Sequence, residues 1–216
     1  MKKETFAKLL NEAYQIYEDK EITCFEKMDI SQFEIFKFNF FERTSYTVFT
    51  VLKTLELTNS QEVMENLKEE LGFYGGKSHK DLMLNSFDSV SKRMGTVADK
   101  RLLPTTKNFI SIKKNMLSSS DKDLVLGNFL AHEMAADNML KNIKKKFFAN
   151  EDDLSYFTAH SSDEIDGEVE KRHFEDAFRV TLKYCIDLDA VLSSALDFFH
   201  AQLLIWREFS RLNNNN

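Results

Sequence analysis

The sequence has few of the residues that divide a chain into short segments. Its 216 residues include a single proline, Pro104, and only six glycines, whereas repeated strands and tight hairpins depend on both residue types at their turns. Leu, Lys, Glu and Phe dominate the long segments between these positions. The shortage of turn residues argues against a β-rich fold and favours one built of helices.

Basic charge, paired cysteines and long apolar runs are also scarce. The formal net charge is -6 and is spread along the chain, which argues against nucleic-acid binding. Cys24 and Cys185 lack the spacing of a zinc knuckle or a redox pair and fit a reducing compartment. No segment approaches the roughly 18 uninterrupted apolar residues of a membrane span, and the N-terminal segment lacks the apolar stretch of a signal peptide. We therefore expect a soluble, cytoplasmic protein without nucleic-acid or membrane partners.

Hydrophobic spacing predicts helices along most of the chain. The expected helices span residues 3–19, 30–57, 60–73, 77–94, 105–117, 120–147, 151–161, 163–184 and 187–212. Residues 33–57 are rich in Phe and β-branched residues, but they exceed the length of a usual strand without a turn signal. We interpret them as part of one long, mostly buried helix whose polar side chains point largely toward solvent. These polar residues are Lys37, Glu42, Arg43 and Lys53.

A carboxylate and an imidazole flank a glycine-rich turn. Glu70 lies near the end of the helix expected at 60–73, and His79 lies near the start of the helix expected at 77–94. If these two helices pack together, the turn brings both side chains within reach of one iron or manganese ion. Taken alone, the pair also fits a surface glutamate and a surface histidine.

A second candidate is an acid inside an apolar helix. Glu133 lies in the segment LVLGNFLAHEMAADNML, residues 124–140. Burying such an acid is costly unless it is paired, hydrogen-bonded or bound to a metal. Asp137 follows one turn later and could share the face of Glu133, whereas His132 points about 100° away and is expected to be peripheral.

A third group of candidates lies in residues 156–178, which contain two of the five histidines and many acids. Asp166, Glu170 and His173 fall at positions i, i+4 and i+7, so they form one stripe on an α-helix. Three donors on one stripe can chelate a metal ion. This stripe is our preferred set of ligands.

The same segment allows a second register and a non-functional interpretation. His160 has Glu164 one turn after it, but the next position in that series is Gly167, which offers no ligand. His160 is therefore kept as an additional ligand beside His173. The alternative is that residues 161–172 form a solvated acidic loop and the start of a helix.

The combined donor set is rich in carboxylates and poor in nitrogen, which suits iron because hard oxygen donors stabilise its oxidised form. Over roughly residues 60–180 the pattern resembles the heme-oxygenase-like diiron oxidases and oxygenases. That family is expected to have a Glu near the end of one core helix, a His shortly after, a Glu on a middle helix and a late His-x-x-x-Asp-x-x-His motif. Glu70, His79 and Glu133 match the first three positions. Asp166-x-x-x-Glu170-x-x-His173 has the late spacing, with Asp for the first His and Glu for the Asp.

The resemblance implies a single all-α domain over residues 1–216, a heme-oxygenase-like bundle of about seven core helices. It also implies a nonheme diiron enzyme that uses two Fe(II) ions and dioxygen to oxidise a small amino-acid-like or fatty-acid-like substrate. C–C cleavage, N-oxygenation and nitrile formation are all open, and homodimer formation is left open as well. The implied catalytic residues are Glu70, His79, Glu133 and His173, and the implied metal ligands are these four with His160, Asp166 and Glu170.

Related scaffolds supply the alternatives. Thiaminase-II-like and pyrroloquinoline-quinone-synthase-like proteins share the helical scaffold without a diiron site, and a scaffold alone does not fix function. A true heme oxygenase would need a histidine near the N-terminus, but the first histidine is His79. A ferritin-like bundle would need two Glu-x-x-His pairs, and only Glu170-x-x-His173 is clear. A non-catalytic helical binding protein is the rival from another class.

Overall fold

The computed structural model describes residues 1–73, 77–149, 156–157 and 168–212, and all the regular secondary structure within these ranges is helical. The elements are α1 (Lys3–Lys27), the 3-10 turn η1 (Ile30–Gln32), α2 (Phe33–Thr44), α3 (Thr47–Thr58), α4 (Gln61–Glu70), α5 (His79–Met94), α6 (Pro104–Ser118), α7 (Lys122–Phe147), α9 (Glu168–Tyr184) and α10 (Leu188–Phe209). The expected all-α fold is confirmed. The helix expected at 151–161 falls largely outside the described residues, of which only Tyr156 and Phe157 belong to it.

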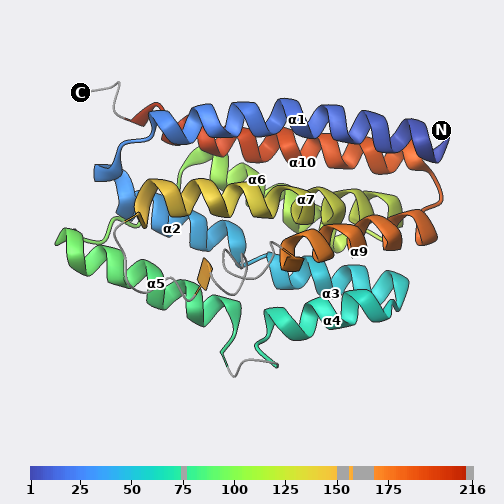
Figure 1. Ribbon diagram of the computed structural model, residues 1–216, viewed down its shortest axis with the longest axis horizontal. Helices are drawn as coiled ribbons and strands as arrows, with labels where there is room; N and C mark the ends of the chain where they lie inside the picture. The colour runs from blue at the N-terminus through green and yellow to red at the C-terminus, as the bar shows by residue number, and fades with distance from the viewer. Residues whose placement is uncertain (74–76, 150–155, 158–167, 213–216) are drawn as a thin grey trace.

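Helix α7 lies at the centre of the arrangement and contacts α10, α9, α1 and α3. Helices α1 and α10 run side by side along one edge of the molecule (Figure 1). On another side of α7, α3 packs on α4, and α4 in turn packs on α9 and α5. Two different neighbourhoods therefore meet at α7. One is formed by α1 and α10, and the other by α3, α4 and α9.

The long helix expected at 30–57 is wrong in one respect, because it is broken at Ser45 and Tyr46 into α2 and α3. The hydroxyls of Thr44 and Ser45 donate to the carbonyl oxygens of Phe40 and Phe41 one turn earlier, at 2.8 and 2.7 Å. Such bonds are also made by Thr54 inside the continuous α3, so they accompany the break and are not sufficient to cause it. The break separates the end of α2 from the start of α3.

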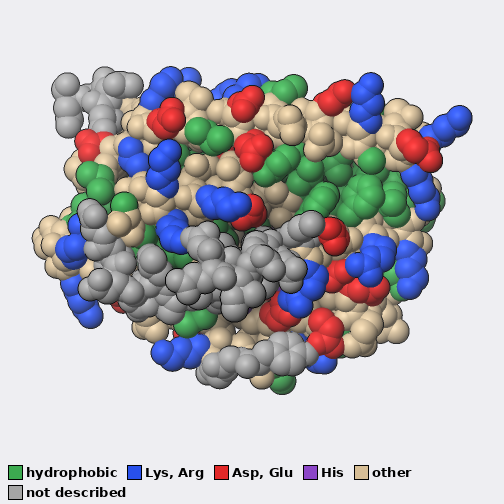
Figure 2. Space-filling view, in the orientation of Figure 1, with side chains coloured by type: hydrophobic (Ala, Val, Ile, Leu, Met, Phe, Trp, Pro, Cys, Tyr) green, Lys and Arg blue, Asp and Glu red, His purple; other side chains and the backbone are tan. Residues whose placement is uncertain are grey.

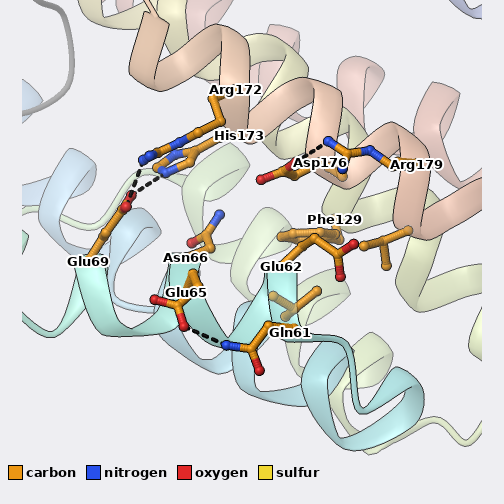
Figure 3. Close-up of a pocket in the computed structure, with 13 residues that line it drawn as sticks. Gln61, Glu62, Glu65, Asn66, Glu69, Phe129, Arg172, His173, Asp176 and Arg179 are labelled. Atoms are coloured by element: carbon orange, nitrogen blue, oxygen red, sulfur yellow. Dashed lines mark hydrogen bonds and ion pairs between the residues drawn. The ribbon is translucent and has the colours of Figure 1, made fainter.

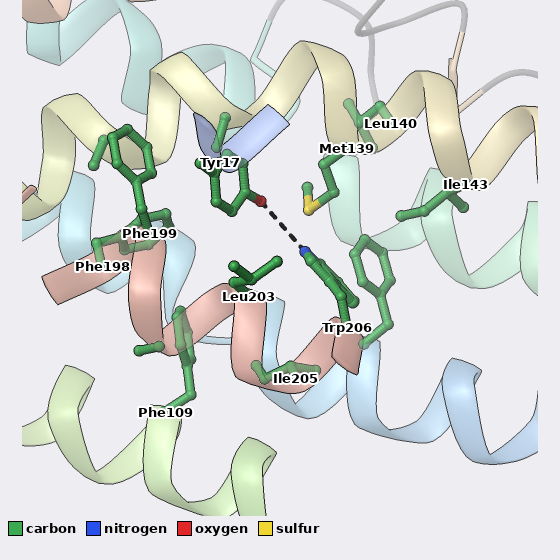
Figure 4. Packing of buried hydrophobic residues seen from close by; sticks show 14 of the residues in the cluster. Tyr17, Phe109, Met139, Leu140, Ile143, Phe198, Phe199, Leu203, Ile205 and Trp206 are labelled. Carbon is green, nitrogen blue, oxygen red and sulfur yellow. Dashed lines mark hydrogen bonds between the residues drawn. The ribbon is translucent and has the colours of Figure 1, made fainter. Parts of the chain in front are cut away.

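The core is a cluster of aromatic rings between α2, α5, α7 and α10. Phe36 occupies its middle, with its ring centroid 4.6 Å from that of Phe147 and 5.6 Å from that of Phe40. Trp206 of α10 joins the same cluster and donates from its indole nitrogen to the hydroxyl of Tyr17 at 3.3 Å (Figure 4). Each aromatic pair adds about 0.5–1.5 kcal/mol beyond its buried area. Much of the sequence's Phe content is therefore accounted for by packing.

Helices α7 and α10 approach each other closely at Gly127. A Cβ atom at this position would lie 2.3 Å from the carbonyl oxygen of Val191 and 2.7 Å from the Cβ of Ser194. Only a residue without a side chain fits between these backbones. The contact fixes α10 against α7 and thereby fixes the other residues of both helices relative to each other.

Helix α10 is long and apolar enough, by length and composition, to cross a membrane. Half of the residues in its most apolar window are buried inside the protein, against α7, α1 and α6. A helix in the core of a folded protein can meet the same criteria of length and composition. On the face shown in Figure 2, acidic and basic side chains alternate and do not form a patch of one sign.

Candidate metal centre

Glu70 and His79 lie next to each other across a turn. Glu70 is the last residue of α4 and His79 is the first residue of α5, and the distance from Glu70 Oε1 to His79 Nδ1 is 3.3 Å. Their side chains are 15 and 13% exposed. Gly72 begins the turn with a φ of +79°, and a Cβ there would collide with the backbone of Lys77 at 2.3 Å. The turn therefore depends on glycine and positions the carboxylate against the imidazole.

Glu133 and His173 form a second pair of the same chemical kind. Glu133 lies in the middle of α7, His173 lies in α9, and Glu133 Oε2 is 3.9 Å from His173 Nδ1. Both side chains are almost completely buried. Asn66 of α4 donates to the other carboxylate oxygen of Glu133 at 3.2 Å. Three helices thus converge on this pair.

Sequence reasoning missed Glu69, which contacts the far side of His173. The Oε2 atom of Glu69 is 2.6 Å from His173 Nε2, and Arg172 donates to Oε1 at 2.6 Å (Figure 3). Burial alone would raise the pKa of the Glu69 carboxyl, but the hydrogen bond to His173 and the nearby cations hold the pKa below its ordinary value. No pattern in the sequence singles out Glu69, because its contact with His173 depends on how α4 packs against α9. Because Nε2 is engaged by Glu69, the Nδ1 atom of His173 is the one that faces Glu133.

Both carboxylate–imidazole pairs line one cavity of about 340 Å³. Glu70, His79, Glu133 and His173 all line it. The rest of its wall is mainly apolar and includes Phe41, Val48, Met83, Met139 and Leu140. A second hollow of about 640 Å³ lies between α4 and α9 and shares His173 (Figure 3). The cavity has the size and the mixed lining of a small-molecule site.

Three sequence expectations about neighbouring residues need correction. Arg43 was expected to face solvent, but it is 3% exposed and lines the cavity, because it lies on the same buried face of α2 as Phe36 and Phe40. His132 was expected to be peripheral, but it is buried in the cavity wall with its ring edge-on to Phe198. Asp137 does not share the site, because its carboxylate pairs with Lys141 at 2.6 Å on the surface of α7.

The remaining expected ligands are not described. His160 and Asp166 lie outside the described residues, and Glu170 belongs to α9 but its side chain is outside the described part. Within the described ranges, no three His, Cys, Asp or Glu side chains come close enough to bind one metal ion together. The Asp166, Glu170 and His173 stripe and the role of His160 therefore stay predictions.

The described donors nevertheless fit iron in kind. Each of the two pairs offers one carboxylate and one imidazole, the ligand types that nonheme iron sites use. Glu69 holds the outer nitrogen of His173, which is the usual arrangement behind a metal-binding imidazole. Each ion would need further donors, which the predicted late stripe could provide.

Comparison with known proteins shows a likeness in structure only. No family model and no curated protein matches the sequence. Two crystal structures of a CADD-like protein of unknown function from Nostoc punctiforme PCC 73102 match the fold. One has a TM-score of 0.69 at 18% identity and covers 96% of this chain and 97% of that chain. The other has a TM-score of 0.67 at 17% identity, with coverages of 96 and 95%. The likeness confirms an all-α, heme-oxygenase-like fold.

Proposed function

We propose that this chain is a nonheme diiron oxygenase or oxidase whose substrate is a small organic molecule bound in the 340 Å³ cavity. The observation that carries the proposal is the meeting of Glu133 and His173 inside the protein, where both side chains are almost completely buried. A buried carboxylate in such surroundings is costly and is usually retained for a partner or a ligand. A matching pair, Glu70 and His79, lines the same cavity.

In this proposal Glu70 and His79 hold one ion, and Glu133 and His173 hold the other. His173 binds through Nδ1, since its Nε2 atom faces Glu69. Asp166, Glu170 and His160 are the further proposed ligands. When bound, the two ferrous ions would activate dioxygen for oxidation of the substrate.

The side chains around Glu133 and His173 hold these two proposed ligands in position. Asn66 fixes one oxygen of Glu133, which leaves the other oxygen directed toward His173. Glu69 sets the orientation of the His173 ring. The mainly apolar wall of the cavity favours a substrate with an apolar body.

An anaerobic titration with ferrous iron tests the proposal. The wild-type chain should bind close to two irons, and admission of oxygen should produce a transient visible absorption. His173→Ala should lose at least one of the two irons, because it removes an imidazole that faces Glu133. His200→Ala is the matched control, since His200 is exposed on α10 and does not line the cavity. Its iron content should equal that of the wild type.

Other outcomes would favour the alternative classes. A wild-type chain that takes up no iron would contradict the diiron proposal and favour a metal-independent enzyme of the thiaminase-II or pyrroloquinoline-quinone-synthase kind, or a binding protein. An iron content that His173→Ala leaves unchanged would contradict the assignment of ligands. A cytoplasmic location fits two free cysteines. This location and the oligomeric state stay predictions.

A further inference from the structure

The exposed part of the cavity wall shows where the 340 Å³ cavity opens to solvent. Among the described residues that line it, only three are exposed, and all the others are buried or half-buried. The three are Ser45 at the α2–α3 break, Phe49 in the first turn of α3 and Lys80 in the first turn of α5. The wall also includes Met139 and Leu140 of α7, which are 4 and 3% exposed. The mouth of the cavity therefore lies between the α2–α3 break and the start of α5.

The two carboxylate–imidazole pairs lie at different depths below this mouth. The side chains of Glu70 and His79 are 15 and 13% exposed, whereas those of Glu133 and His173 are 6 and 5% exposed. His79 also directly precedes Lys80, which belongs to the mouth. A molecule that enters the cavity therefore meets the Glu70–His79 pair first and the Glu133–His173 pair second.

Phe49 is the apolar side chain among the three exposed residues of the mouth. It is 54% exposed and does not belong to the buried face of α3, which is formed by Thr50, Val51 and Thr54. Its ring centroid is 6.3 Å from that of Tyr46. Single exposed apolar side chains are common on protein surfaces, so exposure alone is not informative. The position of Phe49 is informative, because its ring lies where a substrate must pass.

We propose that Phe49 sets the width of the cavity entrance and thereby selects substrates by their cross-section. This inference rests on the proposed function in one respect, because it takes the cavity to be the substrate site. The ring of Phe49 turns about its side-chain torsions between rotamers, so it narrows or clears the mouth while the helices stay in place. Ser45 is too small to cover the mouth, and Lys80 carries a solvated charge. A narrow molecule passes the ring of Phe49, whereas a wide one must displace it.

Two neutral probes of different width, phenol and 1-naphthol, test the proposal in the metal-free protein. Their rates of entry are measured by ¹³C-methyl exchange NMR at Met139 and Leu140, which line the buried part of the cavity. The quantity compared is the ratio of the 1-naphthol rate to the phenol rate. Phe49→Ala should raise this ratio by about fivefold or more, because the wide probe no longer waits for the ring to move. Phe49→Trp should lower it.

Leu52→Ala is the matched control. Leu52 is also a large, exposed apolar residue of α3, at 40% exposure, but it does not line the cavity. Its replacement should change the ratio of entry rates less than about twofold, because the mouth is untouched. A ratio that Phe49→Ala changes no more than Leu52→Ala does would overturn the proposal. Circular dichroism verifies that each variant is folded.

The affinity for phenol separates a role at the entrance from a general loosening of the fold. Phe49→Ala should change the Kd of phenol less than about threefold, because a wider entrance speeds entry and release alike. Wild-type protein in which neither probe shifts the methyl resonances of Met139 and Leu140 would contradict the proposal, which requires entry at this mouth. Because all these measurements use metal-free protein, their failure is distinct from a failure to bind iron.

Discussion

A carboxylate is buried on each of two sides of α7, but the surroundings of the two carboxylates differ. On the side of α1, Glu21 receives hydrogen bonds from Tyr17 and from Asn138, the latter at 2.7 Å. On the side of α4 and α9, Glu133 receives a hydrogen bond from Asn66 and faces an imidazole at the wall of a cavity. The first carboxylate is completely buried among packed side chains and lines neither of the two hollows described above. The second has room for a ligand, and this difference separates a structural acid from a candidate catalytic one.

The close packing of α7 against α10 predicts that this side of α7 does not tolerate a larger side chain at Gly127. Gly127→Ala should destabilise the protein by about 3 kcal/mol, because its Cβ would meet the Val191 carbonyl oxygen at 2.3 Å and neither backbone can yield easily. Denaturant unfolding measures the change. Gly95→Ala is the control. Its Cβ meets nothing within 4 Å, so only its φ of +61° costs energy, about 1 kcal/mol. Equal losses in the two variants would contradict the close-contact explanation.

The Glu21 side also predicts a pH dependence of stability. Burial raises the pKa of Glu21 to about 7, although hydrogen bonds from Tyr17 and Asn138 and the charge of Arg43 oppose the rise. A carboxyl with a raised pKa in the folded state contributes stability below its unfolded pKa and loses it as pH rises through about 7. Between pH 5 and 8 the wild type should lose on the order of 2 kcal/mol through this group.

Glu21→Gln isolates that contribution, because the amide has nearly the same shape and does not titrate. The difference in unfolding free energy between wild type and variant should shrink or reverse in sign as pH rises from 5 to 8. Chemical denaturation at several pH values measures it. A difference that is constant with pH would show that Glu21 has an ordinary pKa.

The smallest effect is expected at the outer surface of α7. Asp137→Asn breaks an ion pair with Lys141 in which both side chains are well exposed, so the loss should stay below about 0.5 kcal/mol. Iron uptake should be unchanged, because Asp137 does not line the cavity. A drop in bound iron per chain would mean that Asp137 belongs to the metal centre.

Hydrophobic spacing in the sequence predicted most of the helices, and the apolar neighbours of Glu133 predicted that this acid is buried. Burial of an acid in an apolar helix is a local signal, and so is the glycine turn between Glu70 and His79. The break at Ser45 was not predictable from hydrophobic spacing, because that spacing continues from α2 into α3 and no proline or glycine marks the break. Arg43 was assigned to the wrong surface because its charge was weighed above its spacing from Phe36 and Phe40, which places it on the buried face of α2.

The neighbours of the candidate ligands were harder to predict. Glu69 and Glu70 are adjacent in sequence, and only the rotation of α4 decides that Glu69 contacts His173 while Glu70 contacts His79. Asn66 likewise reaches Glu133 from a different helix. Contacts between helices depend on rotational settings of about 100° per residue, which a single sequence does not provide.

The location of bound iron tests the central claim most directly. Crystals of the chain prepared anaerobically with ferrous iron should give anomalous scattering peaks at the iron edge. We predict two peaks in the cavity, one beside Glu70 and His79 and one beside Glu133 and His173, each within coordination distance of the named side chains. Iron found only elsewhere on the protein, or no iron in the cavity, would contradict the account.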